Sequence, residues 1–260
     1  MVKVVVCGKG GSGKSTVAAM IAKNLAGRGF NVLVVDMDES NFGLHRQLGV
    51  ELPEDFVNYF GGRRKTAEKF LSKGGKKDKG EPLRLRVRDI PERFLSRKGN
   101  ISLLAIGKVH GFGEGCACPM GALARTLLES LELEEGEFVI VDTDAGIEHF
   151  GRGVEGGSDL ILVVVDPTYE SAKLSGKIME MAESIGKPAY LILNRVNGET
   201  AEVVMKLVDG SRVLGVIPES KEIFRAGLLG EELKAQPKEV AEIVDKLIQA
   251  AHPTSHQSKQ

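Results

Sequence analysis

Short apolar runs recur along the chain at intervals that suit an alternating α/β fold. Each run is four to six residues long and consists mostly of Val, Ile and Leu, with few polar residues inside the run. Such runs are typical of parallel strands that helices cover on both faces. We therefore predict seven buried strands, at residues 2–7, 32–35, 101–106, 138–141, 160–165, 190–193 and 213–217.

Segments with apolar residues at helical spacing lie between these runs. One such segment stops at Gly27 and Gly29, one follows Pro119, and one stops at Gly186. A final helix is expected over residues 237–251. Because strands and helices alternate in one continuous pattern, the predicted fold class is α/β, with a single doubly wound, mostly parallel sheet flanked by helices.

The pattern predicts one domain over residues 1–252 and a polar, disordered tail over residues 253–260. The net charge is −1, but residues 61–98 hold 14 Lys or Arg against 5 Asp or Glu. We interpret this segment as a basic insertion, which is either simply solvated or a docking surface for an acidic partner. Residues 83–87 alternate in polarity and are predicted to form an edge strand within it.

Composition excludes several classes of protein. No apolar run reaches the roughly 18–20 residues of a membrane span, and the N-terminus lacks the apolar region of a signal peptide. We therefore expect a cytoplasmic protein without a membrane partner. Trp is absent and aromatic residues make up 5%, which argues against a nucleic-acid partner. Three cysteines cannot build a disulfide framework and favour free thiols or metal ligation.

The clearest chemical motif follows the first predicted strand directly and leads into a helix. Its glycines let backbone N–H groups turn toward phosphate oxygens, and the helix N-terminus adds partial positive charge. In such a loop Lys14 reaches the β- and γ-phosphates of a nucleotide, and Ser15 holds Mg²⁺. The predicted phosphate-binding residues are Gly8, Lys9, Gly10, Gly11, Ser12, Gly13, Lys14, Ser15 and Thr16.

Carboxylates stand at the ends of two other predicted strands. Asp36 and Asp38 follow the second strand, while Asp142 and Asp144 follow the fourth. The carboxyl ends of parallel strands border the ligand crevice of an open α/β sheet, so these groups should lie near the glycine-rich loop. Each aspartate could instead cap a helix or start a turn.

A cysteine pair forms a second candidate site. Cys116 and Cys118 are separated by one residue, so in an extended chain their Cα atoms lie roughly 6.6 Å apart and their side chains share a side. Both thiolates can then bind one metal ion. Pro119 suits the first position of a helix, which would place Cys118 near the N-cap, where the helix dipole lowers the thiol pKa. His110 is a possible extra ligand or an exposed loop residue.

Two thiolates do not complete a structural metal site, which normally has four ligands. A symmetric dimer supplies four if the two loops face each other across its axis. Tetrahedral sulfur coordination would suit Zn²⁺ and a square-planar arrangement would suit Ni²⁺, and the residues leave both open. The cysteines could also be small apolar fillers in a loop.

Lys9 makes the glycine-rich loop resemble the deviant Walker A motif of the MinD, ParA and nitrogenase-iron-protein superfamily. The resemblance implies an ATP-sandwiched homodimer in which Lys9 reaches the nucleotide of the facing subunit. It also implies that Asp38 orients the attacking water, that Asp142 supports Mg²⁺ through its water shell, and that the Gly146 N–H senses the γ-phosphate.

The same resemblance implies a binding site for the base of the nucleotide. Asn194 and the following Arg195 match the position of the adenine-contacting asparagine of the superfamily, and the turn at Pro218 closes the other side of the base. The implied catalytic residues are Lys9, Lys14 and Asp38.

Two further segments make the chain resemble one family within this superfamily. Gly-Cys-Ala-Cys-Pro-Met-Gly-Ala-Leu-Ala-Arg at residues 115–125 and Val-Asp-Thr-Asp-Ala-Gly-Ile-Glu-His-Phe-Gly-Arg-Gly at residues 141–153 resemble the CooC-type ATPases. This family matures carbon monoxide dehydrogenase, so the resemblance implies a nickel-delivering ATPase with that enzyme as client. Asp144 departs from the Glu expected in many relatives. Two alternatives stay open: a MinD- or ParA-type positioning ATPase, and an iron–sulfur reductase or scaffold.

Overall fold

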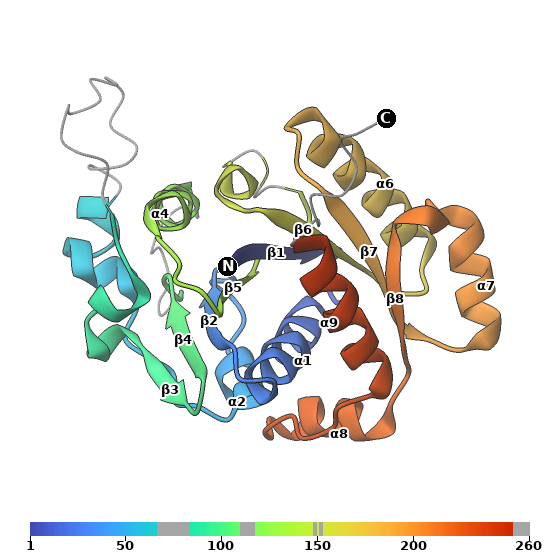
Figure 1. Ribbon diagram of the computed structural model, residues 1–260, viewed down its shortest axis with the longest axis horizontal. Coiled ribbons are helices and arrows are strands. Elements are labelled where there is room, and N and C mark those ends of the chain that lie inside the picture. Colours follow the sequence, from blue (N-terminus) through green and yellow to red (C-terminus); the bar gives the residue numbers. More distant parts are fainter. Residues whose placement is uncertain (67–83, 110–117, 148–149, 151–152, 252–260) are drawn as a thin grey trace.

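Eight strands form one sheet through the centre of the molecule (Figure 1). This computed structural model describes residues 1–66, 84–109, 118–147, 150 and 153–251. The strands lie in the order β3-β4-β2-β5-β1-β6-β7-β8, and within the described residues only β3 runs antiparallel to its neighbour. The strands are β1 (Val2–Gly8), β2 (Asn31–Asp36), β3 (Ser96–Lys98), β4 (Ile101–Ala105), β5 (Glu137–Asp142), β6 (Leu160–Val165), β7 (Ala189–Val196) and β8 (Val213–Pro218).

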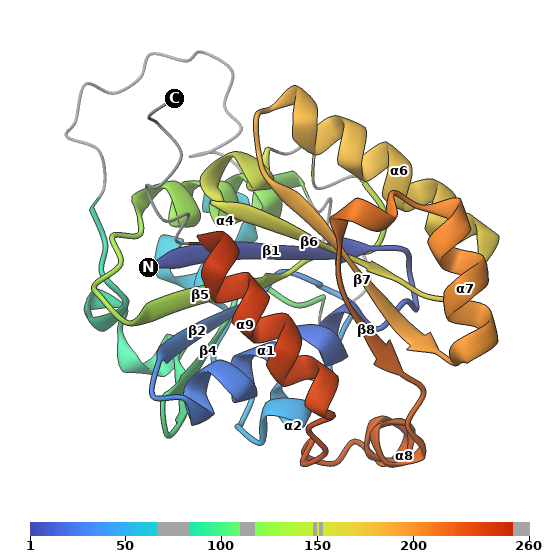
Figure 2. The same cartoon turned by 45° about the vertical axis from the view of Figure 1, so that its right-hand side comes forward.

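Helices cover both faces of the sheet (Figures 1 and 2). The α-helices whose bounds both fall within the described residues are α1 (Lys14–Gly27), α2 (Leu44–Leu48), α4 (Cys118–Ser130), α6 (Tyr169–Ser184), α7 (Gly198–Leu207), α8 (Lys221–Leu229) and α9 (Lys238–Ala251). Short 3-10 helices are η1 (Phe56–Phe60), η2 (Val87–Asp89), η3 (Glu92–Phe94), η4 (Val154–Gly157) and η5 (Gly210–Arg212). Helices α1 and α9 lie side by side on one face, and α4 and α6 cover the other.

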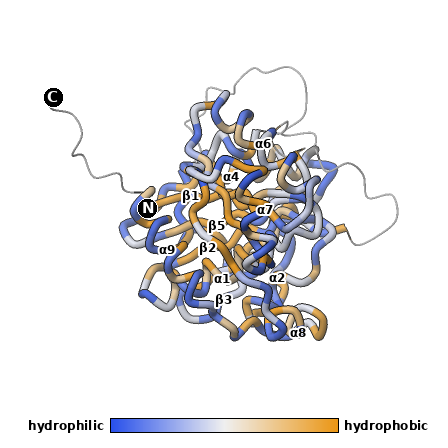
Figure 3. Tube along the Cα trace, turned by 90° about the vertical axis from the view of Figure 1, so that its right-hand side faces the viewer, coloured by the Kyte–Doolittle hydropathy of each residue, from blue (hydrophilic) through white to orange (hydrophobic). Residues whose placement is uncertain are grey.

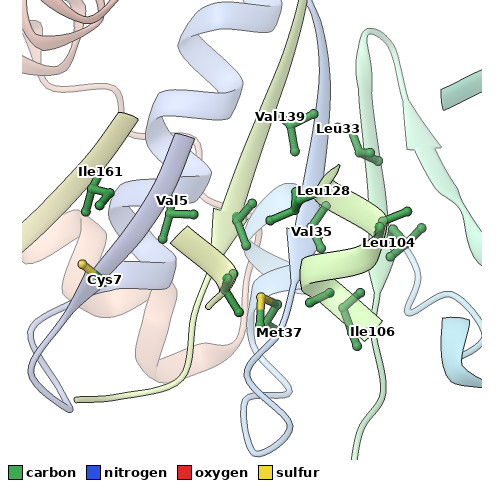
Figure 4. Packing of buried hydrophobic residues seen from close by; sticks show 14 of the residues in the cluster. Val5, Cys7, Leu33, Val35, Met37, Leu104, Ile106, Leu128, Val139 and Ile161 are labelled. Atoms are coloured by element: carbon green, nitrogen blue, oxygen red, sulfur yellow. The ribbon is translucent and has the colours of Figure 1, made fainter. Parts of the chain in front are cut away.

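The hydrophobic core has two layers, one on each face of the sheet. On β1, Val4 and Val6 join the layer beneath α1 and α9, whereas Val5 and Cys7 join the layer beneath α4 and α6. Figure 4 shows Leu128 of α4 among side chains from neighbouring strands. The most hydrophobic chain segments therefore run through the middle of the molecule (Figure 3). Burial of both faces explains the continuous apolar runs, and it confirms the predicted fold class and all seven strands.

The predicted edge strand over residues 83–87 is wrong. Leu85 makes one isolated bridge with Leu131, and the chain then turns into η2. The turn forms because the Asp89 carboxylate accepts a hydrogen bond of 2.9 Å from the backbone N–H of Arg86. The antiparallel edge strand is instead β3, which pairs with β4.

The second half of the basic segment packs against the domain. Ile90, Phe94 and Leu95 are buried in the hydrophobic layer that contains α4. Residues 67–83, which hold the lysine-rich part of the segment, lie outside the described residues, as do residues 252–260 at the C-terminus. Within the described part of the chain, no helix combines the length and the apolarity that crossing a bilayer requires.

Candidate active site

The glycine-rich loop connects β1 to α1 through backbone conformations that suit glycine. Gly8, Gly11 and Gly13 have φ angles of 141°, 79° and 91°. A Cβ on Gly13 would lie 2.4 Å from Nδ2 of Asn194, so no side chain fits there without displacing Asn194. With α1 starting at Lys14, the loop has the open backbone and the helix N-terminus that a phosphate cradle needs.

The two lysines of the loop have different surroundings. Lys14 is 6% exposed, and its Nζ lies 3.4 Å from the backbone oxygen of Lys9. This hydrogen bond is long and joins the ammonium to a neutral carbonyl, so a phosphate oxygen would be a better acceptor. Lys9 is half-buried, and its side chain makes no hydrogen bond or ion pair with any residue that the structure describes.

Asn194 and Arg195, at the carboxyl end of β7, support the loop from the side. The Asn194 amide donates to the backbone oxygen of Ser12 at 2.8 Å, and the Arg195 guanidinium donates to that of Gly11 at 2.9 Å. Arg195 has a φ of 57°, a conformation that costs energy for a residue with a side chain. Its backbone is therefore held in place by its surroundings, as is common for residues that position a binding loop.

A cavity of about 330 Å³ lies next to these residues. Its lining includes Thr16, Asn194, Arg195 and Pro218, which brings together the residues predicted to surround the base. Phe224 and other residues of α8 complete one wall, and these were not predicted from the sequence. The cavity therefore offers an apolar and amide-lined space beside the phosphate loop, which suits a planar heterocycle.

Asp142 ends β5 directly beside β1, opposite Val6. Its side chain is fully buried, and neither carboxylate oxygen has a hydrogen-bond partner among the described residues. Burial raises the pKa of Asp142 to about 8, and the negative charge of Asp36 adds to this, whereas the nearby Ser15 hydroxyl and Lys14 oppose it. Buried oxygens without partners, beside a serine hydroxyl, fit the oxygen ligands that Mg²⁺ takes near nucleotide phosphates.

The loop after β2, residues 37–43, is here called the switch loop, and it carries Asp38. The carboxylate of Asp38 accepts hydrogen bonds from the backbone N–H and the hydroxyl of Ser40, at 3.0 and 2.7 Å. Asn41 lies at the other end of the loop, and its amide donates to the Ser15 hydroxyl at 2.7 Å. The switch loop is thus connected directly to the serine that the sequence assigns to Mg²⁺.

Lys108 is a residue of this site that the sequence analysis missed. Its side chain is 0% exposed, and its Nζ lies 2.6 Å from a carboxylate oxygen of Asp36, which ends β2. Burial raises the pKa of Asp36 to about 6, while the Lys108 ammonium opposes the shift. A lysine three residues after a buried strand, next to an acidic strand end, is the signal that could have identified it.

Gly146 lies close to the glycine-rich loop. Its backbone N–H donates to the backbone oxygen of Gly8 at 3.2 Å, so contact with a γ-phosphate requires this bond to open. Asp144 is half-buried beside it.

The predicted metal ligands are only partly described. Helix α4 begins at Cys118, within one residue of the predicted start, but the side chain of Cys118 lies outside the described part of the structure, as do Cys116 and His110. Among the described residues there is no cluster of three or more His, Cys, Asp or Glu side chains that could hold a metal ion.

Comparison with known proteins places this site in a family. The sequence model of the CobQ/CobB/MinD/ParA nucleotide-binding domain matches residues 3–233. The chain belongs to this family. An uncharacterized ATP-binding protein of Methanocaldococcus jannaschii is 51% identical over 94% of this chain and 98% of its own length.

Two further relatives add detail. The carbon monoxide dehydrogenase accessory protein CooC of Rhodospirillum rubrum is 34% identical over 88% of both chains. The solved structure of the septum site-determining protein MinD of Pyrococcus horikoshii, in complex with Mg-ADP, has a TM-score of 0.70 and covers 96% of each chain at 18% identity. The chain is therefore a P-loop ATPase of the MinD/ParA family, as the loop and the acidic strand ends predicted.

In this MinD/ParA-family ATPase, Asp142→Asn should stabilise the nucleotide-free protein near neutral pH. A folded-state pKa of about 8, above the ordinary 3.8 of an aspartate, means that the folded protein keeps a proton that the unfolded chain has lost. The free energy of unfolding should therefore fall as pH rises from about 4 to about 8. An amide cannot ionise, so at roughly 1.4 kcal/mol per pKa unit the variant should gain several kcal/mol at pH 8 and almost nothing at pH 4.

Urea unfolding of both proteins across this pH range measures the effect. Asp144→Asn is the matched control, because it makes the same chemical change two residues away on a side chain that is only half-buried. An unchanged slope for Asp142→Asn would show that this carboxyl is not protonated in the folded protein. Added Mg²⁺ and ATP should stabilise the native chain and fail to stabilise the Asp142→Asn variant.

Proposed function

We propose that this chain is an ATP-driven metallochaperone. It dimerises around bound nucleotide, binds Ni²⁺ or Zn²⁺ through Cys116 and Cys118 at the dimer axis, and delivers nickel to carbon monoxide dehydrogenase. The observation that carries the proposal is the Cys-Ala-Cys segment at the start of α4 in a chain that is 34% identical to the accessory protein CooC.

Contacts between the switch loop and the residues that follow β4 support a link between ATP and the metal loop. The backbone N–H of Val109 donates to the backbone oxygen of Glu39 at 3.1 Å. The Arg63 guanidinium donates to the Glu39 carboxylate and to the backbone oxygen of Lys108, each at 2.7 Å. Lys108 and Val109 immediately precede residues 110–117, which contain Cys116, so a change in the switch loop acts on the segment that leads to the thiols.

ATP binding first requires two hydrogen bonds to change. Lys14 exchanges the backbone oxygen of Lys9 for the β- and γ-phosphates. The Ser15 hydroxyl accepts a hydrogen bond from Asn41 and would have to give up this contact in order to help hold Mg²⁺. Ser15 and Asp142 are the residues that would hold this ion, which when bound neutralises charge on the phosphates. Loss of the Asn41 contact releases the switch loop from α1.

Hydrolysis then depends on positioning and charge. Asp38 leaves Ser40 and accepts a hydrogen bond from the attacking water, which it orients toward the γ-phosphorus. Lys14 and the backbone N–H groups of the loop stabilise the negative charge that spreads over the transferring phosphoryl group. Asn194 and Pro218 hold adenine in the neighbouring cavity.

The dimer completes both sites. Lys9 has no partner within the described part of its own chain, which supports a role toward the nucleotide of a second subunit. Each subunit supplies one pair of thiolates, so two subunits give the four ligands of a closed metal site. ATP hydrolysis would then separate the subunits and release the ion to the client.

A cell that depends on carbon monoxide dehydrogenase at low nickel tests this function. With Cys116→Ser and Cys118→Ser combined, the client should accumulate without nickel, because hydroxyl groups are poor ligands for this ion, and excess nickel should partly restore activity. Cys7→Ala is the matched control, since Cys7 is buried in the core. Full client activity in the double variant at low nickel would overturn metal delivery and favour a positioning ATPase.

A further inference from the structure

We propose that Lys108 is a positioning residue for ATP hydrolysis, which holds the switch loop so that Asp38 is directed at the attacking water. The inference rests on the proposed role of Asp38 and assigns to Lys108 a function that its sequence neighbourhood does not indicate. It starts from the surroundings of one fully buried ammonium group.

The ammonium of Lys108 has three N–H donors, and the structure gives all three an acceptor. These are the carboxylate of Asp36, the backbone oxygen of Asp38 and the backbone oxygen of Asn41, each 2.6 Å from Nζ. The acceptors are 67 to 72 residues away in the sequence. Two of the three lie on the switch loop, so the lysine joins the segment that follows β4 to that loop.

These bonds fix the backbone of Asp38 on both sides. Its N–H donates to a carboxylate oxygen of Asp36 at 3.2 Å, and its own backbone oxygen accepts from Lys108. Lys108 also donates to the backbone oxygen of Asn41. One ammonium group therefore holds the switch loop at both Asp38 and Asn41. The side chain of Asp38 is the part left to move, and its present partner is Ser40.

Lys108 is itself held in place. Its backbone N–H donates to the carboxylate of Asp55 at 3.1 Å, and its backbone oxygen accepts from Arg63 at 2.7 Å. Arg63 also binds Glu39, the neighbour of Asp38 in the switch loop. The backbone of Lys108 is therefore fixed to the domain. A fixed backbone is what the lysine needs in order to set the position of Asp38.

Neutralising Asp36 explains only part of this arrangement. A buried aspartate needs a single counterion, and one hydrogen bond from Lys108 supplies it. The other two hydrogen bonds go to backbone carbonyls of the loop that carries Asp38. A lysine that only balanced charge would not need to place two-thirds of its donors there.

The test must separate charge balance from positioning. Lys108→Met alone would leave the Asp36 carboxylate buried without a counterion and could unfold the protein. The Asp36→Asn, Lys108→Met pair removes both charges together, and the asparagine oxygen can still accept the N–H of Asp38. This pair should fold with a thermal midpoint near that of the native chain, bind ATP within about threefold, and show a kcat lowered roughly 10- to 100-fold.

Lys246→Met is the matched control. Lys246, on α9, donates to the backbone oxygen of Leu214 on β8, and removal of this lysine should leave kcat unchanged. If the Asp36→Asn, Lys108→Met pair hydrolyses ATP at the native rate, Lys108 serves only to balance Asp36 and the inference is overturned.

A double-mutant cycle with Asp38→Ala completes the test. Once Asp38 has been removed, adding Asp36→Asn and Lys108→Met should lower kcat less than twofold further. Effects that multiply would show that Lys108 acts elsewhere. Turnover is measured without client or metal, so failure of metal delivery leaves this result standing. Native turnover in Asp38→Ala alone would remove the role of Asp38, and the Lys108 inference with it.

Discussion

Lys14→Ala is expected to abolish ATP binding and hydrolysis while the protein stays folded. Among the described residues the Lys14 ammonium makes a single long hydrogen bond, of 3.4 Å, to a residue of its own loop, so its loss costs the protein little when ATP is absent. With ATP bound, the same ammonium would make charge-assisted bonds to two phosphates, each worth about 1.5–3 kcal/mol. Affinity for ATP, measured by calorimetry, should therefore fall at least 100-fold.

Lys9→Ala is the matched control in the same loop. Since Lys9 has no partner in the described part of its own chain, this variant should still bind ATP as a monomer but fail to form the tight dimer. If Lys14→Ala binds ATP within a few-fold of the native chain, the phosphates do not lie where the loop places them.

Asp38→Ala should separate hydrolysis from binding. The phosphate loop connects β1 to α1 and does not include Asp38, so the variant should bind ATP and dimerise normally. A general base or water-orienting carboxylate contributes about 10²- to 10⁴-fold to the rate, and kcat should fall by at least about 100-fold. Single-turnover measurements with tightly bound ATP report this step directly.

Ser40→Ala and Asp144→Ala provide the controls for Asp38. The Ser40 hydroxyl donates to the Asp38 carboxylate and has no proposed contact with the attacking water, so its loss should leave kcat within a few-fold of the native value. Near-native turnover in Asp38→Ala would instead show that another residue orients the water. Asp144 would be the first candidate, because it follows the neighbouring strand β5.

Local patterns in the sequence were sufficient to predict most of the fold. The strands could be predicted because helices bury both of their faces, which makes their sequences continuously apolar. The phosphate loop could be predicted because its residues are contiguous in the sequence. Helices α7 and α8 were not predicted. On α8, Phe224 is 71% and Leu228 is 72% exposed, so their apolar character does not mark a face that packs on the core.

Site residues at the ends of strands could be predicted from the sequence. Site residues whose position depends on partners far away in the sequence could not. Asp142 was identified because it ends a strand beside the loop. Lys108 was missed because its burial depends on Asp36, Asp38 and Asn41, all far away in the sequence. The predicted edge strand failed for a different, local reason, since the Asp89 carboxylate accepts from the backbone N–H of Arg86, three residues earlier, and turns the chain.

The metal content of the protein with and without Mg²⁺ and ATP tests the central claim most directly. Light scattering combined with metal analysis should find one metal ion per two chains in a dimer that forms with ATP. The Cys116→Ser, Cys118→Ser variant should form the same dimer without metal, because its phosphate loop is intact. A mass that does not change with ATP, or a metal ion that remains in the double variant, would contradict the account.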